Sequence, residues 1–199
     1  SIESLWALDN SKPFGSRTTK DFLYKNYPEG KMTTYTNDFI KVTFFYEEEN
    51  APQQWVIGDS TKQILGYNCI KADCDFRGRH WIAWFATDIP IKDGPWKLNG
   101  LPGLILEAYD SGLGYHYTAT SIDEEPDFPV TLYYFEGDQK MKTERLVYNS
   151  NLEKYLMGAD FDELELLQEA KEEGIPVKFA RRRAKKIRYD FLERDHLTQ

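Results

Sequence analysis

The feature that most constrains the fold is a six-residue stretch in the middle of the chain, Gly100-Leu101-Pro102-Gly103-Leu104-Ile105. Proline restricts the backbone angle φ at one position, while the two glycines allow angles that other residues avoid. Such a stretch suits a kinked backbone packed closely against something bulky. Trp84 and Trp96 are the best candidates for that neighbour.

The segments on either side of this stretch predict a broad, aromatic-rich hairpin. Residues 79–87 read as a strand with apolar side chains on both faces: Trp81, Ala83 and Phe85 on one, Ile82 and Trp84 on the other. We therefore expect other parts of the chain to pack on both faces of that strand. Turn sequences at 93–95 and 99–100 follow it, and a new strand begins at Leu104.

The rest of the chain up to residue 136 continues the pattern of short strands. Runs rich in β-branched and aromatic residues predict about eight of them: 31–36, 39–46, 53–57, 62–74, 79–87, 104–109, 115–122 and 130–135. No helix separates these strands, which excludes a parallel βαβ sheet. The predicted class is α+β, mainly antiparallel β, as a curved sheet or half-barrel meander with C-terminal helices.

Helical signals are concentrated at the C-terminal end. Asp160 with Glu163 forms a capping box, and Gly174 stands where a helix C-terminus favours glycine, so residues 160–173 predict a helix. A second helix is predicted from Pro176 onward, and a short one around residues 18–24. The expected domains are an antiparallel β domain at 1–158 and a helical extension at 159–199.

Charge and hydropathy exclude two classes of partner. The formal charge of -8 and the pI near 5.0 oppose general nucleic-acid binding, which needs positive charge to replace phosphate counterions. No apolar run approaches the ~20 residues of a membrane-spanning helix, so we expect no transmembrane segment. The chain begins with Ser1, which predicts a processed or trimmed N-terminus.

Cys69 and Cys74, the only two cysteines, are a candidate disulfide. Five residues of extended strand span ~16 Å, whereas a disulfide needs its Cα atoms within about 7 Å. The pair can bridge only if residues 70–73 turn or bulge. In a continuous strand the two side chains point to opposite faces and stay independent thiols.

No motif predicts a metal, cofactor or catalytic site. The cysteines together with His80 and His116 show no known ligand spacing, so we expect no metal and no cofactor. The chain lacks a nucleophile elbow, a zinc-protease motif and a phosphate-binding glycine loop. Carboxylates for acid and base catalysis are present in the central region, but turns and edges explain them equally well: Asp73, Asp75, Asp88 and Glu107.

The aromatic residues are the ligand-binding candidates. Aromatic side chains make up 15% of the chain, and those around the central hairpin can either line a cavity for an apolar ligand or fill an ordinary core. The candidates are Trp55, Tyr67, Trp81, Trp84 and Trp96.

Several short motifs resemble one protein family. The matching segments are Gly66-Tyr67-Asn68-Cys69, Lys71-Ala72, Phe76-Arg77-Gly78-Arg79, Ala83-Trp84-Phe85-Ala86, Asp88-Ile89-Pro90, Gly94-Pro95 and the central six residues. On these segments, within residues 52–136, the chain resembles the GLPGLI family of secreted or envelope proteins from Bacteroidetes. The resemblance implies an exported protein of the periplasm or cell envelope. It brings no established activity.

Three functions stay open from the sequence. The preferred one is a non-enzymatic envelope protein that binds an apolar small molecule, a lipid, a peptide or an envelope protein partner on a curved, aromatic-rich sheet. The second is a structural or assembly module that acts through its C-terminal helices. The third is a hydrolase that uses acidic residues near the central hairpin.

Overall fold

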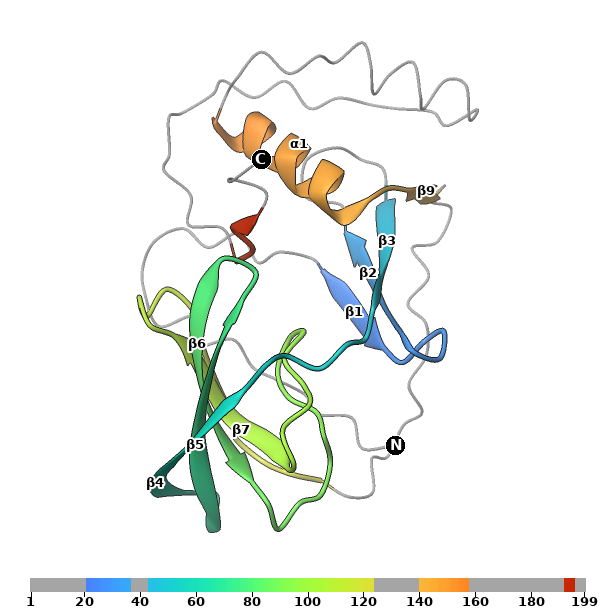
Figure 1. Cartoon of the computed structure of the whole chain (residues 1–199). Coiled ribbons are helices and arrows are strands. Elements are labelled where there is room, and N and C mark those ends of the chain that lie inside the picture. Colours follow the sequence, from blue (N-terminus) through green and yellow to red (C-terminus); the bar gives the residue numbers. More distant parts are fainter. Residues whose placement is uncertain (1–20, 37–42, 124–139, 158–191, 196–199) are drawn as a thin grey trace. The chain divides into compact units, whose positions relative to one another are not determined.

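The computed structural model of this chain describes residues 21–36, 43–123, 140–157 and 192–195 (Figure 1). These residues belong to two compact units. The first contains residues 51–123 and 192–194, and the second contains residues 21–36, 43–50, 140–157 and 195. The boundary predicted at residue 158 lies just outside the described residues, so the division into 1–158 and 159–199 stays a prediction.

The first unit is built on a five-stranded antiparallel sheet whose strands follow one another in chain order. They are β4 (Val56–Ile64), β5 (Tyr67–Phe76), β6 (Arg79–Ala86), β7 (Leu104–Asp110) and β8 (His116–Thr118). The loops Leu65-Gly66 and Arg77-Gly78 have positive φ at both positions. Type I′ hairpin turns need this geometry, and their twist matches that of the strands they join.

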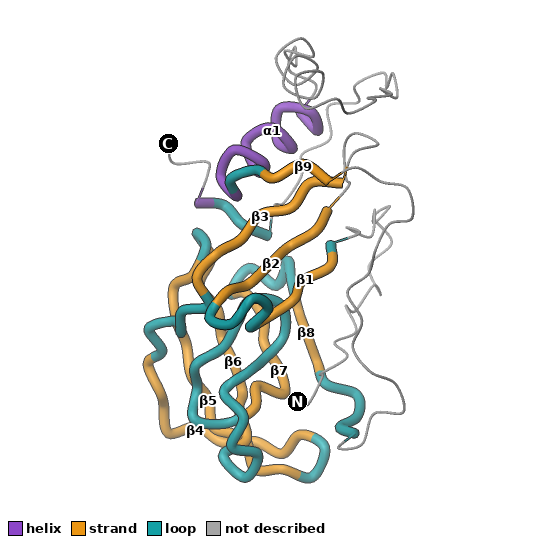
Figure 2. The backbone as a smooth tube through the Cα atoms, turned by 90° about the vertical axis from the view of Figure 1, so that its right-hand side faces the viewer, coloured by secondary structure: helices purple, strands orange, loops and turns teal. Residues whose placement is uncertain are grey.

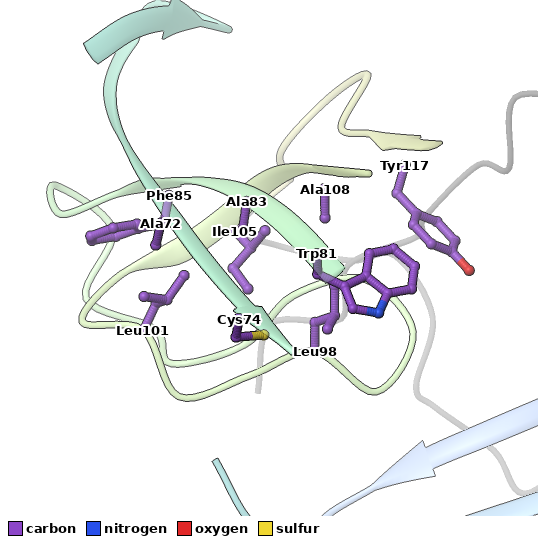
Figure 3. Packing of buried hydrophobic residues seen from close by; sticks show 10 residues of the cluster. All are labelled: Ala72, Cys74, Trp81, Ala83, Phe85, Leu98, Leu101, Ile105, Ala108 and Tyr117. Carbon is purple, nitrogen blue, oxygen red and sulfur yellow. The ribbon is translucent and has the colours of Figure 1, made fainter. Parts of the chain in front are cut away.

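Both faces of this sheet carry an apolar cluster, as the pattern of residues 79–87 predicted. The main core lies on one face (Figure 3) and consists of Ala72, Cys74, Trp81, Ala83, Phe85, Leu98, Leu101, Ile105, Ala108 and Tyr117. The second cluster lies on the other face and consists of Cys69, Ala86, Leu104 and Leu106, with Tyr67 and Trp84 packed against it. The alternation of side chains along each strand separates the two sets.

The glycines of the central stretch are required by close backbone contacts. A Cβ at Gly103 would lie 2.2 Å from the carbonyl oxygen of Ala86. A Cβ at Gly100 would lie 2.4 Å from Cβ of Pro52, and Gly100 has a φ of +92°. The bulky neighbours of the two glycines are thus Pro52 and the chain at Ala86, and the expectation that they would be tryptophan rings is wrong.

The leucines of the stretch belong to the apolar clusters against which the two tryptophans pack. Leu101 is part of the main core, against which Trp96 packs. Leu104 is part of the second cluster, against which Trp84 packs. The stretch therefore supplies side chains to both faces of the sheet, and this explains why it ends in an unbroken apolar run.

Two buried ion pairs complete the first unit. Arg79 Nη1 lies 2.7 Å from Asp110 Oδ2, and Lys97 Nζ lies 2.5 Å from Glu193 Oε1. All four residues are buried. Arg79 Nε also donates a hydrogen bond to the carbonyl of Leu192 at 2.9 Å, so the 192–194 segment is tied into this unit. Buried charges are tolerated only when they are paired, and each pair here satisfies that condition.

The second unit has a four-stranded sheet and a helix (Figure 2). The strand order is β1 (Phe22–Lys25), β2 (Lys31–Thr36), β3 (Thr43–Glu49) and β9 (Lys140–Lys142), and β9 leads to α1 (Arg145–Met157). Tyr148 of α1 packs against Phe44 and Tyr46 of β3, with ring centroids 5.7 and 5.9 Å apart. Its hydroxyl forms a 2.7 Å hydrogen bond with the Thr36 hydroxyl. The helix therefore packs against β3 and the end of β2.

The predicted mainly antiparallel β fold is confirmed for the described residues, in which only β9 pairs in parallel, with β3. Within these residues the strands form two open sheets. A short helix was expected around residues 18–24, but residues 22–24 belong to β1, which pairs with 32–35 of β2. The strand expected at 130–135 and the C-terminal helices lie outside the described residues. Among those described, no helix is long and apolar enough to cross a membrane.

The substitution Gly103→Ala should destabilise the first unit by about 1–3 kcal/mol or more, because the new methyl group meets backbone atoms that cannot rotate away. Gly58→Ala is the matched control, since a Cβ there would lie at an ordinary 3.6 Å from its nearest neighbour. Urea unfolding followed by tryptophan fluorescence measures both variants. Equal effects at the two glycines would contradict the close contact.

The substitution Asp110→Ala should lower the free energy of unfolding by about 3–5 kcal/mol, because it leaves the buried Arg79 charge without its partner. Asp75→Ala removes a carboxylate from the same unit whose side chain is 88% exposed, and it should cost about 1 kcal/mol or less. The same urea experiment compares them. A loss at Asp110 as small as that at Asp75 would show that the Arg79 pair is unimportant.

Candidate functional site

A cluster of polar side chains lies beside the second cluster of the first unit and centres on Glu107. Its other members are Lys62 from β4, Trp84 from β6, and His116 and Thr118 from β8. We refer to these five residues as the Glu107 cluster. Its members come from four of the five strands of the sheet, so the sheet itself sets their positions.

A β-bulge gives Glu107 its direction. Along β6 and β7, Trp84 pairs with Glu107, but the next residue, Phe85, pairs with Ile105. Leu106 is therefore the extra residue of the bulge, and both Leu106 and Glu107 are directed to the side of the sheet that carries Trp84. Without the bulge, strict alternation would send Leu106 and Glu107 to opposite faces.

Both carboxylate oxygens of Glu107 are engaged. Oε2 forms an ion pair with Lys62 Nζ, and Oε1 lies 2.8 Å from His116 Nε2. The Glu107 side chain is only 13% exposed, whereas those of Lys62 and His116 are 34% and 42% exposed. The Glu107 carboxylate is thus largely buried, and two more exposed donors, Lys62 and His116, hold it in place.

Aromatic rings border the same cluster. Lys62 Nζ lies 4.4 Å from the centroid of the Trp84 ring, a distance that favours a cation–π interaction. The Tyr109 ring meets His116 edge-on, with centroids 5.4 Å apart. The indole nitrogen of Trp84 is buried and has no hydrogen-bond partner among the described residues. The Thr118 hydroxyl lies 3.3 Å from His116 Nε2 and adds one more polar group.

A second histidine on the same sheet provides a contrast. His80 Nδ1 lies 2.8 Å from Asp75 Oδ1, the same separation as in the His116–Glu107 pair. Asp75 is 88% exposed, however, and belongs to a hairpin rim. Surface pairs of this kind contribute little to stability and are common on sheets. Within the described residues no three metal-binding side chains come together, so this part of the chain has no candidate metal centre.

The two cysteines do not form the disulfide considered from the sequence. β5 is continuous from Tyr67 to Phe76, and its pairing with β6 is unbroken. Cys69 lies in the second cluster and Cys74 in the main core, so the thiols are on opposite faces of the sheet and both are free. Burial raises the pKa of Cys69, and burial beside the carboxylates of Asp75 and Asp73 raises the pKa of Cys74 to about 12.

The five aromatic residues predicted as ligand-binding are not brought together. Trp81 is a fully buried member of the main core, and Trp55 and Trp96 pack against it. Trp96 lies 5.5 Å from Trp81 between ring centroids, and Trp55 Nε1 donates a hydrogen bond to the Asn99 carbonyl at 2.8 Å. Only Tyr67 and Trp84 lie on the side of the Glu107 cluster. The set thus divides between the two faces.

Part of the Glu107 cluster could be read from the sequence. Glu107 and His116 were considered there, but for separate roles, as a general carboxylate and as a metal ligand. Lys62 was not considered, because it reaches Glu107 from β4, with two strands between β4 and β7. Nothing in the sequence marks the bulge that brings these residues together, because neither Leu106 nor Glu107 is replaced by a glycine or a proline.

Solved structures with a related fold were found in two crystal forms of PNGF-II. The structure in the C2 space group matches with a TM-score of 0.50, and that in the P21 space group with a TM-score of 0.52. In both, the sequence identity is 20%, and the match covers 71% of this chain and 26% of the PNGF-II chain. This chain therefore corresponds to about a quarter of the length of PNGF-II, and the likeness concerns the fold alone.

A family model identifies the chain more directly. The model described as "N-glycanase peptide, N-terminal domain" matches residues 31–150, which is more than half of the chain. The chain belongs to this family. A search of curated proteins found no match.

These findings correct two conclusions drawn from the sequence. The assignment to the GLPGLI family is wrong, since the family that matches is the N-terminal domain of N-glycanase. The preferred function, a non-enzymatic envelope protein of the GLPGLI type, is wrong for the same reason, because the family is named for an enzyme. The six residues that suggested the assignment are explained by packing: their glycines allow close approach to Pro52 and Ala86.

Both thiols should resist alkylation by iodoacetamide at neutral pH in the folded protein and react in urea, because only the thiolate is nucleophilic and burial suppresses it. The unfolded thiol ionises near pH 9 and folded Cys74 only near pH 12, so stability should fall as pH rises between these values. Cys74→Ala should lessen this fall. Rapid alkylation of native protein would contradict the buried positions.

Proposed function

We propose that this chain takes part in the removal of N-linked glycans from glycoproteins, as an N-terminal domain of the N-glycanase type that engages the glycosylated substrate. The observation that carries the proposal is the family match over residues 31–150. That range includes most of both units, with all the strands from β2 to β9. The assigned segment thus contains every described strand of the two sheets except β1.

The fold of the first unit suits contact with a large substrate. Its antiparallel sheet carries the main core on one face, while the Glu107 cluster on the other keeps partly exposed polar and aromatic side chains. Sites placed on strands are held more firmly than sites on loops. The likeness to PNGF-II supports the same fold for a domain that forms part of a longer enzyme.

The proposed substrate also implies a location. N-linked glycans are carried on surface loops of secreted proteins, so a protein that acts on them meets its substrate outside the cytoplasm. We therefore propose that this chain is exported, to the periplasm or the cell envelope. Its partner in this proposal is an N-glycosylated protein.

The test compares two forms of one glycoprotein, a form carrying high-mannose N-glycans and a form made with glutamine at its glycosylation sites. The purified chain should bind the glycosylated form in biolayer interferometry and should not bind the unglycosylated form. Equal binding to both forms, or binding to neither, would contradict the proposal.

Mass spectrometry of the same glycoprotein after incubation adds a second readout. Hydrolysis by an N-glycanase converts the linking asparagine to aspartate and frees the glycan. Conversion by this chain would place catalysis within it, while binding without conversion would limit its part to engaging the substrate.

A further inference from the structure

Within the Glu107 cluster the charges of Lys62 and Glu107 offset one another. Lys62 and Glu107 form an ion pair, and each neutralises the other. An anion would have to displace Glu107 from Lys62, and a cation would have to displace Lys62 from Glu107. A charged ligand therefore loses an existing interaction for each one that it gains, whereas a neutral ligand can add hydrogen bonds to the pair as it stands.

The cluster offers hydrogen-bonding groups of both kinds at its open rim. The lysine ammonium donates, the threonine hydroxyl both donates and accepts, and a neutral imidazole that donates from Nε2 to Glu107 keeps an acceptor at Nδ1. Lys62 and His116 remain 34% and 42% exposed while they hold the carboxylate. Sugar hydroxyls match this mixture because each of them donates and accepts.

An apolar surface lies next to these groups. Trp84 is the direct cross-strand neighbour of Glu107, and the Tyr109 ring contacts His116. A pyranose ring presents C–H groups on its face and hydroxyls around its edge, so it fits beside an aromatic ring with polar groups at the border.

We propose that the Glu107 cluster is a sugar-binding site that takes a neutral pyranose residue of an N-linked glycan. Glu107 and His116 bind the hydroxyls of the sugar, Lys62 holds Glu107 in position and covers one face of Trp84, and the Tyr109 ring beside His116 contributes the apolar side. The identity of the sugar as part of an N-glycan rests on the proposed function, whereas the preference for a neutral polyhydroxylated ring rests on the cluster itself.

The test measures binding of a free high-mannose N-glycan, released from its protein, by isothermal titration calorimetry. The variants Glu107→Gln and His116→Ala should each weaken binding by about tenfold or more, because each removes a hydrogen bond to or beside a charged group. His80→Ala is the matched control, because its 2.8 Å pair with Asp75 lies on the same sheet but outside the cluster. It should change the affinity by less than about twofold.

Two further measurements complete the test: one detects misfolded variants, and the other tests the preference for a neutral sugar. Circular dichroism and the urea midpoint identify any variant that is misfolded, and Glu107→Gln preserves the side-chain shape in case His116→Ala disturbs the fold. A sialylated glycan serves as the charged probe, and it should bind no more tightly than the neutral one. Tighter binding of the sialylated probe would overturn the preference for a neutral sugar.

The outcomes also separate this proposal from the proposed function. Binding of the free glycan that Glu107→Gln and His116→Ala leave unchanged would overturn the site while the glycan-directed function stands. Binding of the glycosylated protein without binding of the free glycan would overturn the site as well. Absence of binding to either would overturn both.

Discussion

The structure of the first unit depends on the close approach between the chain at Gly103 and the backbone at Ala86, next to the end of β6. The backbones at Gly103 and Ala86 are too close for a Cβ atom at Gly103, and this closeness brings the start of β7 against the end of β6. Leu101 and Leu104 are then carried to opposite faces of the sheet, one into the main core and the other into the second cluster. Both apolar clusters therefore depend on this contact.

The same junction determines the polar chemistry of the sheet. At the Gly103 end, β7 pairs with β6 in one register, and beyond Leu106 it pairs in another. The change of register places Glu107 on the side of Trp84, where Lys62 and His116 reach it. An arrangement that serves packing at one end of the strand thus positions a carboxylate a few residues later. The cluster is a product of the sheet's geometry rather than of any local motif.

The sequence alone predicts the features that depend on the alternation of side chains along a strand. The two-faced strand around Trp81 and Trp84 was predicted correctly, because a period of two in the side chains directly reports which face each residue occupies. The closeness of Lys62 to Glu107 could not be predicted, because it depends on the order of strands and on a bulge. Helix α1 was missed since Asn149, Ser150 and Asn151 have weak helix propensity, and packing of Tyr148 on β3 overrides that propensity.

The most direct test of this account is an isotope-edited NOESY spectrum that determines the register between β6 and β7. The account predicts cross-strand contacts between Trp84 and Glu107 and between Phe85 and Ile105, with Leu106 unpaired. Contacts between Trp84 and Leu106, and between Ala83 and Glu107, would mean that the register of the Phe85–Ile105 pair continues unbroken. In that case Glu107 would lie on the opposite face from Trp84, and the proposed site would have no structural basis.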